Sequence, residues 1–244
     1  PILQRRNFPS IRLDVLRNNR KVKIEEVGTP FEIEITNGSE DDLLLLEGEI
    51  LVGGNYARMI ASDMVVSPKE VSRVSVFCFE PQANRETSTF STTSGERFAS
   101  IDVRRIALAG QGQGAVWCEG SRQGTGRNVE ELLAAFVDFP DRFPDAIGVA
   151  VAIGKSLKVV ELFYDSGLFA HYFGAVLNAT IQASSGVERK TGLANDTEGV
   201  RKLLQFPYLA RIQPGEGGLR LKQGGGLTLG MACPGADNLL HLLL

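Results

Sequence analysis

The sequence LLLLEGEILVGG at residues 43–54 places a run of four leucines directly before two acidic residues, Glu47 and Glu49. A continuous apolar run this short is typical of a β-strand that is buried on both faces. Charge beside such a core is costly unless it is paired or used for binding or chemistry. The segment therefore predicts a strand of the interior and, directly after it, a candidate site.

Segments around this run alternate polar and apolar residues with a period of two, which indicates half-buried strands. We expect such strands at 21–27, 31–36 and 73–80, and the strand pattern resumes at 102–109 and 115–119. The first half of the chain, residues 1–120, is therefore predicted to be β-rich.

Helical signals begin after Gly120. Asn128 caps a predicted helix that Pro140 ends, and a second helix begins at Asp165 or Ser166 and continues to about Ala183. A third, shorter helix is predicted over 197–205.

Strands are also expected in this half of the chain. A hairpin is predicted over 148–154 and 157–163, and the glycine-rich tail adds further strands. The predicted fold class is α+β, a β-rich N-terminal half followed by a mixed α/β C-terminal half with about three helices. Residues 1–120 and 121–244 are the expected regions, and one continuous domain fits the same pattern.

Composition excludes several classes of protein. The net charge of −3 argues against the extensive basic surface of a dedicated nucleic-acid binder. Three cysteines are too few and too far apart for a disulfide framework, and two histidines exclude a histidine-rich metal site. The chain has no signal peptide and no apolar run approaching ~20 residues, so we expect a cytoplasmic protein away from membranes.

Five polar residues of the opening segment and its continuation are the candidate site residues. They are Glu47, Glu49, Arg58, Cys78 and Glu80. The paired carboxylates of Glu47 and Glu49 suit divalent-metal binding or acid–base work, or ion-paired structure. Cys78 is a small buried apolar residue or a nucleophile. Glu80 either pairs with Arg58 or Arg85, or lines a site.

Other motifs favour structural roles. The glycine runs at 110–114 and 223–226 lack the sequence context of phosphate loops, so they predict turns that lead into strands. Trp117 is expected in the core on a strand. His241 follows two leucines near the end of the chain, where a satisfied histidine of a last strand is favoured over a catalyst.

Taken in order, LLLLEGEILVGG, Arg58, the Cys78-x-Glu80 pair, QGAVW and the closing LLHL resemble one bacterial family. It is the domain named for its association with ADP-ribosylglycohydrolases and with rhodanese-phosphatase superfamily proteins. Its polar pattern has Gln-Asn before the arginine, where this chain has Tyr56-Ala57, and its Gly-Arg-Trp element is lost or displaced. These departures put a catalytic role in doubt for this member.

The resemblance implies recognition of a nucleotide-like or ADP-ribose-like ligand. Arg58 would hold phosphate, and Glu49 and Glu80 would bind ribose hydroxyls or a divalent metal. One alternative is a non-catalytic protein-interaction module, for which a homodimer is one form. The other is a metal-assisted hydrolase that uses Glu47, Glu49 and Glu80.

Overall fold

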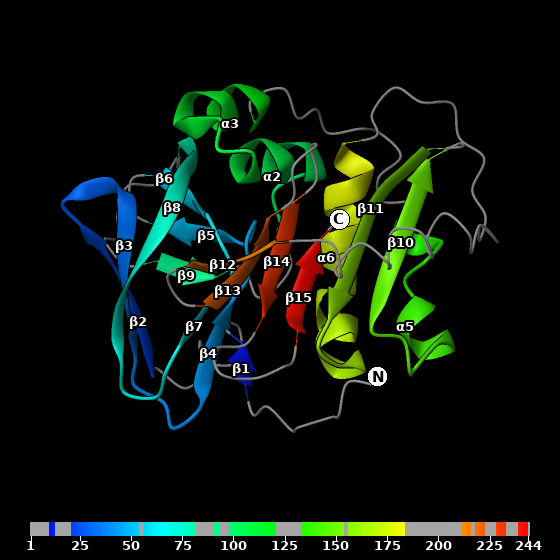
Figure 1. Cartoon of the computed structure of the whole chain (residues 1–244), viewed down its shortest axis with the longest axis horizontal. Coiled ribbons are helices and arrows are strands. Elements are labelled where there is room, and N and C mark those ends of the chain that lie inside the picture. The colour runs from blue at the N-terminus through cyan, green and yellow to red at the C-terminus, as the bar shows by residue number, and fades with distance from the viewer. Residues whose placement is uncertain are drawn as a thin grey trace.

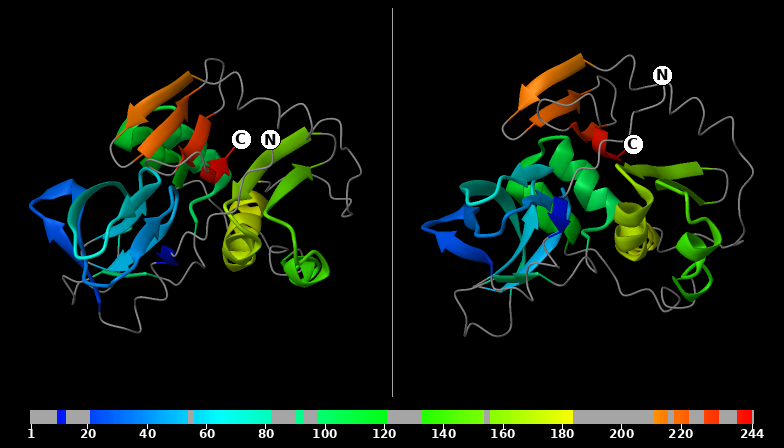
Figure 2. Two further views of the ribbon diagram at one scale, coloured as in Figure 1. Left: turned by 60° about the horizontal axis from the view of Figure 1, so that its bottom comes forward. Right: turned by 90° about the horizontal axis from the view of Figure 1, so that it is seen from below.

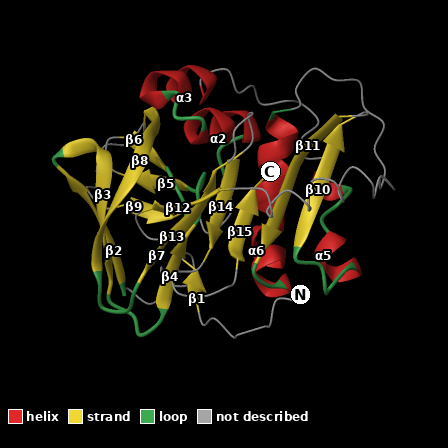
Figure 3. Cartoon of the chain, in the orientation of Figure 1, coloured by secondary structure: helices red, strands yellow, loops and turns green. Residues whose placement is uncertain are grey.

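The computed structural model confirms the α+β fold class (Figures 1 and 3). It describes residues 10–12, 21–53, 56–81, 90–92, 98–120, 133–153, 156–183, 211–215, 218–222, 228–232 and 239–243. Two six-stranded sheets and one three-stranded sheet are present in these ranges.

The N-terminal half contains two of the sheets. The six-stranded sheet has the order β2 (Val22–Val27), β3 (Thr29–Asn37), β8 (Val71–Pro81), β6 (Tyr56–Ile60), β5 (Ile50–Gly53), β9 (Phe90–Thr92). The smaller sheet has the order β1 (Ser10–Arg12), β4 (Asp42–Leu45), β7 (Met64–Val66). The predicted alternation holds in β3, where Ile33 and Ile35 are fully buried and the adjacent Glu32 and Glu34 are not.

The leucine run lies between two cores, as the sequence predicted. Leu43 and Leu45 pack among the inward-facing residues of the six-stranded sheet. Leu44 and Leu46 point the other way, into the core around α6 (Ser166–Gln182). All four side chains are fully buried. One short strand therefore joins the core of the first half to the core of the second.

Two segments predicted as strands are helices. Residues 102–109 lie in or next to α2 (Ile101–Leu108), and residues 115–119 lie in α3 (Gly112–Gly120). The Ser100 hydroxyl caps α2 by accepting a hydrogen bond from the Val103 N–H, and Ile101, Arg104 and Ala107 are buried at helical spacing. The alternating pattern was misleading because it overlaps with this helical periodicity.

The glycine run after α2 forms a turn, as predicted, but it leads into α3 rather than into a strand. Gly110 and Gly112 have φ angles of +71° and +81°. Trp117 consequently lies on a helix and is only partly buried, which corrects its predicted place on a core strand. The two helices pack on β5, β6 and β8 through residues that include Met59, Val103 and Val116.

The second six-stranded sheet belongs to the C-terminal half. Its order is β10 (Gly148–Ile153), β11 (Ser156–Phe163), β15 (Leu239–Leu243), β14 (Thr228–Ala232), β13 (Gly218–Lys222), β12 (Arg211–Gly215). The β10–β11 hairpin and the strands of the tail confirm the predictions. Helix α6 packs against β10 and β11, and α2 lies near α6 and β14 (Figure 2).

The predicted helices have different outcomes. Helix α6 is confirmed with Asp165 as its N-cap, whose carboxylate accepts a hydrogen bond from the Leu168 N–H at 2.7 Å. Pro140 does not end a helix but lies in the first turn of the short α5 (Phe139–Arg142), where a missing N–H costs little. Residues 128–132 and the predicted helix at 197–205 lie outside the described residues.

Truncation of β4 on either face tests its position between two cores. We expect Leu44→Ala and Leu43→Ala each to lower the free energy of unfolding by about 2–5 kcal/mol, because each leaves a cavity in a different core. Urea denaturation measures this. Val71→Ala is the control, since Val71 is 56% exposed on β8 and should change stability by less than about 0.5 kcal/mol. A Leu44→Ala cost as small as that of the control would contradict the two-core arrangement.

Candidate functional site

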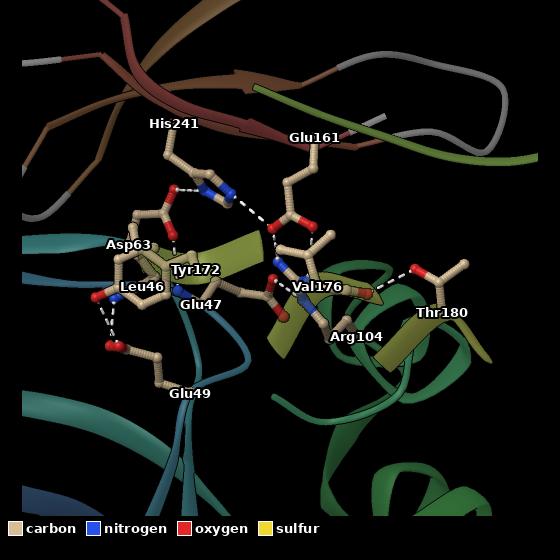
Figure 4. Close-up of polar contacts among 10 residues, drawn as sticks. All are labelled: Leu46, Glu47, Glu49, Asp63, Arg104, Glu161, Tyr172, Val176, Thr180 and His241. Carbon is tan, nitrogen blue, oxygen red and sulfur yellow. Dashed lines mark hydrogen bonds and ion pairs between the residues drawn. The ribbon is translucent and has the colours of Figure 1, made fainter. Parts of the chain in front are cut away.

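Five ionisable side chains converge where the two halves of the chain meet (Figure 4). They come from the turn after β4, the loop before β7, α2, β11 and β15, and none is more than 6% exposed: Glu47, Asp63, Arg104, Glu161 and His241. Buried charges on this scale persist only when they are paired and hydrogen-bonded. We call this group the junction network.

Arg104 is the centre of the junction network. Its Nε donates to Glu47 Oε2 at 2.9 Å, and its two terminal nitrogens donate to the two oxygens of Glu161 at 3.2 and 2.9 Å. The guanidinium carbon also lies 4.8 Å from the ring centre of Phe98. Burial acts to lower the pKa of Arg104, but attraction to Glu161 and Glu47 outweighs it, so the pKa rises above its ordinary value. Arg104 is therefore a permanent cation.

The turn between the two acids needs glycine. Gly48 has a φ of +86°, and a Cβ atom there would lie 2.6 Å from Arg104 Nε and 2.7 Å from its Cδ. The absence of a side chain lets the backbone approach the arginine closely.

His241 bridges two carboxylates. Its Nδ1 lies 2.8 Å from Asp63 Oδ2, and its Nε2 lies 2.8 Å from Glu161 Oε1. Burial acts to lower the pKa of His241, but attraction to Asp63 and hydrogen bonds to both acids raise it to about 10. The ring is therefore an imidazolium that donates from both nitrogens. The predicted satisfied histidine of the last strand is found here.

The pKa values of the acidic partners, Glu161 and Asp63, are shifted downward. Burial alone would raise the pKa of Glu161, but Arg104 and His241 hold it down at about 2. Burial likewise acts against the charge of Asp63, and His241 outweighs it, so the pKa of Asp63 is lowered. Asp63 Oδ1 also accepts the Glu47 N–H at 2.6 Å.

Glu47 differs from the other acids. Burial raises its pKa, and Arg104 only partly offsets this effect. Its Oε2 receives the Arg104 hydrogen bond, whereas its buried Oε1 has no hydrogen-bond partner among the described residues.

Glu49 ties the same turn to α6. Its Oε1 accepts the Tyr172 hydroxyl at 2.8 Å, and its Oε2 accepts the Leu46 N–H at 2.8 Å. The Tyr172 ring is stacked against Phe98 at 5.5 Å and Phe163 at 5.7 Å between ring centres. The carboxylate and the aromatic stack together fix the turn against the second half of the chain.

Arg58 and Cys78 form a separate group in the N-terminal sheet. They are opposite each other on β6 and β8, and Arg58 donates to Cys78 Sγ at 2.7 Å and to Glu26 Oε1 at 3.1 Å. The thiol in turn donates to the Pro30 carbonyl at 3.4 Å. Burial raises the pKa of Cys78, so the sulfur is held as a thiol and not as a reactive thiolate. We call Glu26, Arg58 and Cys78 the arginine–thiol group.

A glutamine of the glycine-rich run supports this group. Gln113 Oε1 accepts the Cys78 N–H at 2.8 Å, and its Nε2 donates to the Cys78 carbonyl at 2.7 Å. The first turn of α3 thereby fixes the backbone of β8 at the cysteine.

Residues 4–214 match a known family, the ARG and Rhodanese-Phosphatase-superfamily-associated Protein domain, or ARPP-1. The chain belongs to the ARPP-1 family. No curated protein and no solved structure was found to match it. The helices of the described residues include none that is long and apolar enough to cross a membrane. In the same ranges, no three His, Cys, Asp or Glu side chains are grouped to hold a metal ion.

The ARPP-1 fold divides the five candidate residues between two places. Glu47 and Glu49 lie at the junction of the two halves, and Arg58 and Cys78 lie in the N-terminal sheet. Glu80 lies in β8 two residues after Cys78, and its side chain is outside the described residues. Their roles in binding or catalysis stay a prediction.

Sequence reasoning missed four partners of these residues: Asp63, Arg104, Glu161 and Tyr172. A helical interpretation of 101–108 would have placed Arg104 on the buried stripe with Ile101 and Ala107, which is a signal for a paired charge. Asp63 and Glu161 carry no local signal, because their partners are distant in the sequence.

Substitution of Gly48 tests the close approach to Arg104. We expect Gly48→Ala to cost about 3–5 kcal/mol of unfolding free energy, the range for breaking a buried ion pair. Gly28→Ala is the matched control, because Gly28 has a φ of +53° and nothing within 4 Å of its Cβ position. It should cost only the backbone strain of about 1–2 kcal/mol. Equal costs in urea denaturation would show that Arg104 can move away from the turn.

The pH dependence of stability tests the charge on His241. The pKa of His241 in the folded protein is about 10, above its ordinary value of 6.5. The histidine therefore stabilises the folded protein fully below pH 6.5, and this stabilisation is lost as the pH rises towards 10. Glu161 behaves in the opposite way, because its pKa is lowered to about 2. It stabilises the folded protein above pH 4.5, and this stabilisation is lost as the pH falls towards about 2.

Denaturation of the wild type and His241→Gln across this range measures the alkaline effect. The wild type should lose stability between pH 6.5 and 10, and the variant should lose less of it. Parallel curves for the two proteins would contradict the imidazolium assignment.

Proposed function

We propose that this ARPP-1 domain binds a nucleotide-like, ADP-ribose-like ligand whose phosphate is held by Arg58. The observation that carries the proposal is the position of the Arg58 guanidinium between a partly exposed carboxylate, Glu26, and an exposed aromatic ring, Tyr56. The side chain of Glu26 is 28% exposed and that of Arg58 is 4% exposed. Tyr56 is 39% exposed, and its ring centre lies 5.5 Å from the Arg58 guanidinium carbon.

Phosphate recognition by Arg58 follows from the chemistry of the arginine–thiol group. A guanidinium offers N–H groups in a planar fork that fits phosphate oxygens. Its contacts among the described residues include the anionic Glu26 and the neutral Cys78 thiol. A phosphate would exchange with the Glu26 carboxylate for the same N–H groups. Cys78 then keeps the arginine oriented and does not act as a nucleophile.

The base or sugar of the ligand would use the aromatic side chains beside this group. Tyr56 and Trp117 are in edge-on contact, with ring centres 6.2 Å apart and an angle of 68° between them. Stacking of a base on such a ring is worth about 1–3 kcal/mol. The replacement of the family's polar pair by Tyr56-Ala57 fits this use, because Ala57 is buried against the helices and Tyr56 is exposed.

The junction network and the neighbouring Glu49 have no part in this proposal. Glu47 and Glu49 are 3% and 6% exposed and are bound to Arg104 and Tyr172. The metal-assisted hydrolase stays a prediction. The interaction module also stays a prediction. It would use the β-rich half, where the described residues Phe31 on β3 and Val71 on β8 are large, apolar and exposed.

Titration calorimetry with ADP-ribose tests the proposal on three variants. Arg58→Gln should weaken binding by on the order of 10- to 100-fold, since a charge-assisted hydrogen bond is lost. Glu26→Gln should tighten binding, because it removes the competing carboxylate. Arg73→Gln should leave affinity unchanged, since Arg73 is a 66%-exposed arginine on β8.

Inorganic pyrophosphate in the same titration separates phosphate recognition from recognition of the base. If the wild type and Arg58→Gln bind ADP-ribose with equal affinity, the assignment of the phosphate site to Arg58 is rejected. Absence of heat and of thermal stabilisation with either compound would reject the function itself.

A further inference from the structure

The charges of the junction network do not balance if every acid is ionised. Arg104 and His241 supply two positive charges, and Asp63 and Glu161 supply two negative charges in direct contact with them. An ionised Glu47 would add an uncompensated negative charge to a region from which water is excluded. Such a charge is expensive, and protonation is the usual way in which a buried carboxylate avoids it.

Hydrogen-bond geometry identifies Glu47 as the acid that carries the proton. Arg104 makes two hydrogen bonds to Glu161 and one to Glu47, so its charge is directed mainly to Glu161. The Glu47 Oε1 atom is buried without a hydrogen-bond partner among the described residues. An anionic oxygen in that position would lose its hydration without replacement, whereas a neutral carboxyl loses much less.

We infer that Glu47 is a neutral carboxylic acid in the folded protein at neutral pH, and that the junction is a buried proton-binding site. Charged groups of the described residues face it from several elements. Arg104 comes from α2, Glu161 from β11, His241 from β15 and Asp63 from the loop before β7. Glu49 on the same turn is occupied by Tyr172 of α6. The direction of the pKa shift of Glu47, upward through burial, agrees with this arrangement.

The contact between the two halves of the chain should therefore weaken as the pH rises. With the proton, the network is electrically neutral and the two halves of the chain are held by matched charges. When Glu47 loses the proton, a negative charge appears beside Asp63 and Glu161, and the repulsion weakens the contact between the halves. This property is independent of ligand binding at Arg58.

Glu47→Gln provides the test, because glutamine has nearly the shape of the neutral acid and cannot lose a proton. Urea denaturation of both proteins at pH 5, 6, 7 and 8 gives the ratio of their folding equilibrium constants. If Glu47 is protonated in the folded protein, the ratio of the wild-type folding constant to the variant folding constant should fall with pH. The fall should be about tenfold for each pH unit above the pKa of Glu47 in the unfolded chain. A flat or rising ratio over this range would overturn the inference.

Glu40→Gln is the control, since Glu40 is a 75%-exposed glutamate that pairs with Lys69 outside the junction network. Its pKa is lowered by Lys69, which predicts a ratio that does not fall between pH 5 and 8, because that stability is lost only as the pH drops. A second readout reports the protonation state of Glu47 directly. The carboxyl ¹³C signal that is present in the labelled wild type and missing in Glu47→Gln should have the chemical shift of a neutral acid at pH 7. A carboxylate shift at pH 7 would also overturn the inference.

Discussion

The hydrogen bonds of Arg104 to Glu47 and to Glu161, the second of which is an ion pair, are the interaction on which the rest of the structure depends. Through one guanidinium, the turn after β4 in the first half is connected to β11 in the second, and α2 carries the arginine between them. Buried ion pairs of this kind add little net stability, since desolvation opposes their attraction. Their strong effect is on specificity, because any displacement of one element leaves a buried charge without its partner.

The protein thus separates two kinds of polar group. The junction network is sealed and internally satisfied except at one oxygen, which suits a structural joint. The arginine–thiol group is next to solvent through Glu26 and Tyr56, which suits exchange of partners with a ligand. The sequence places Glu47 of the first group and Arg58 of the second shortly after one leucine run, and for this reason they resemble parts of a single site when only the order of residues is known.

Much of the fold follows from local patterns. The leucines of β4, the alternation of β3, the β10–β11 hairpin and the Asp165 cap of α6 each have a local cause that is visible in the sequence. The segment that became α2 does not, because its residues fit both an alternating and a helical pattern, and the Ser100 cap is the local feature that favours the helix. In α3 only Val116 is buried, so its sequence pattern does not indicate a helical stripe either.

The candidate site was less predictable for a different reason. Glu47 and Glu49 were recognisable as acids that need partners, but nothing local indicates which partners they have. Arg104 and Glu161 are separated by 57 residues, and Asp63 and His241 by 178. Such pairs are determined by tertiary packing, so propensity and periodicity carry no information about them.

Gln113 affects whether copies of this chain can associate through strand β8. Among the described residues, β3 pairs with β8 as far as Ser75, so in this part of the chain β8 has an edge beyond that residue on which another chain could add a strand. At Cys78 the side-chain amide of Gln113 occupies both the N–H and the carbonyl, as a neighbouring strand would. One side chain therefore protects this edge against intermolecular β-pairing and aggregation.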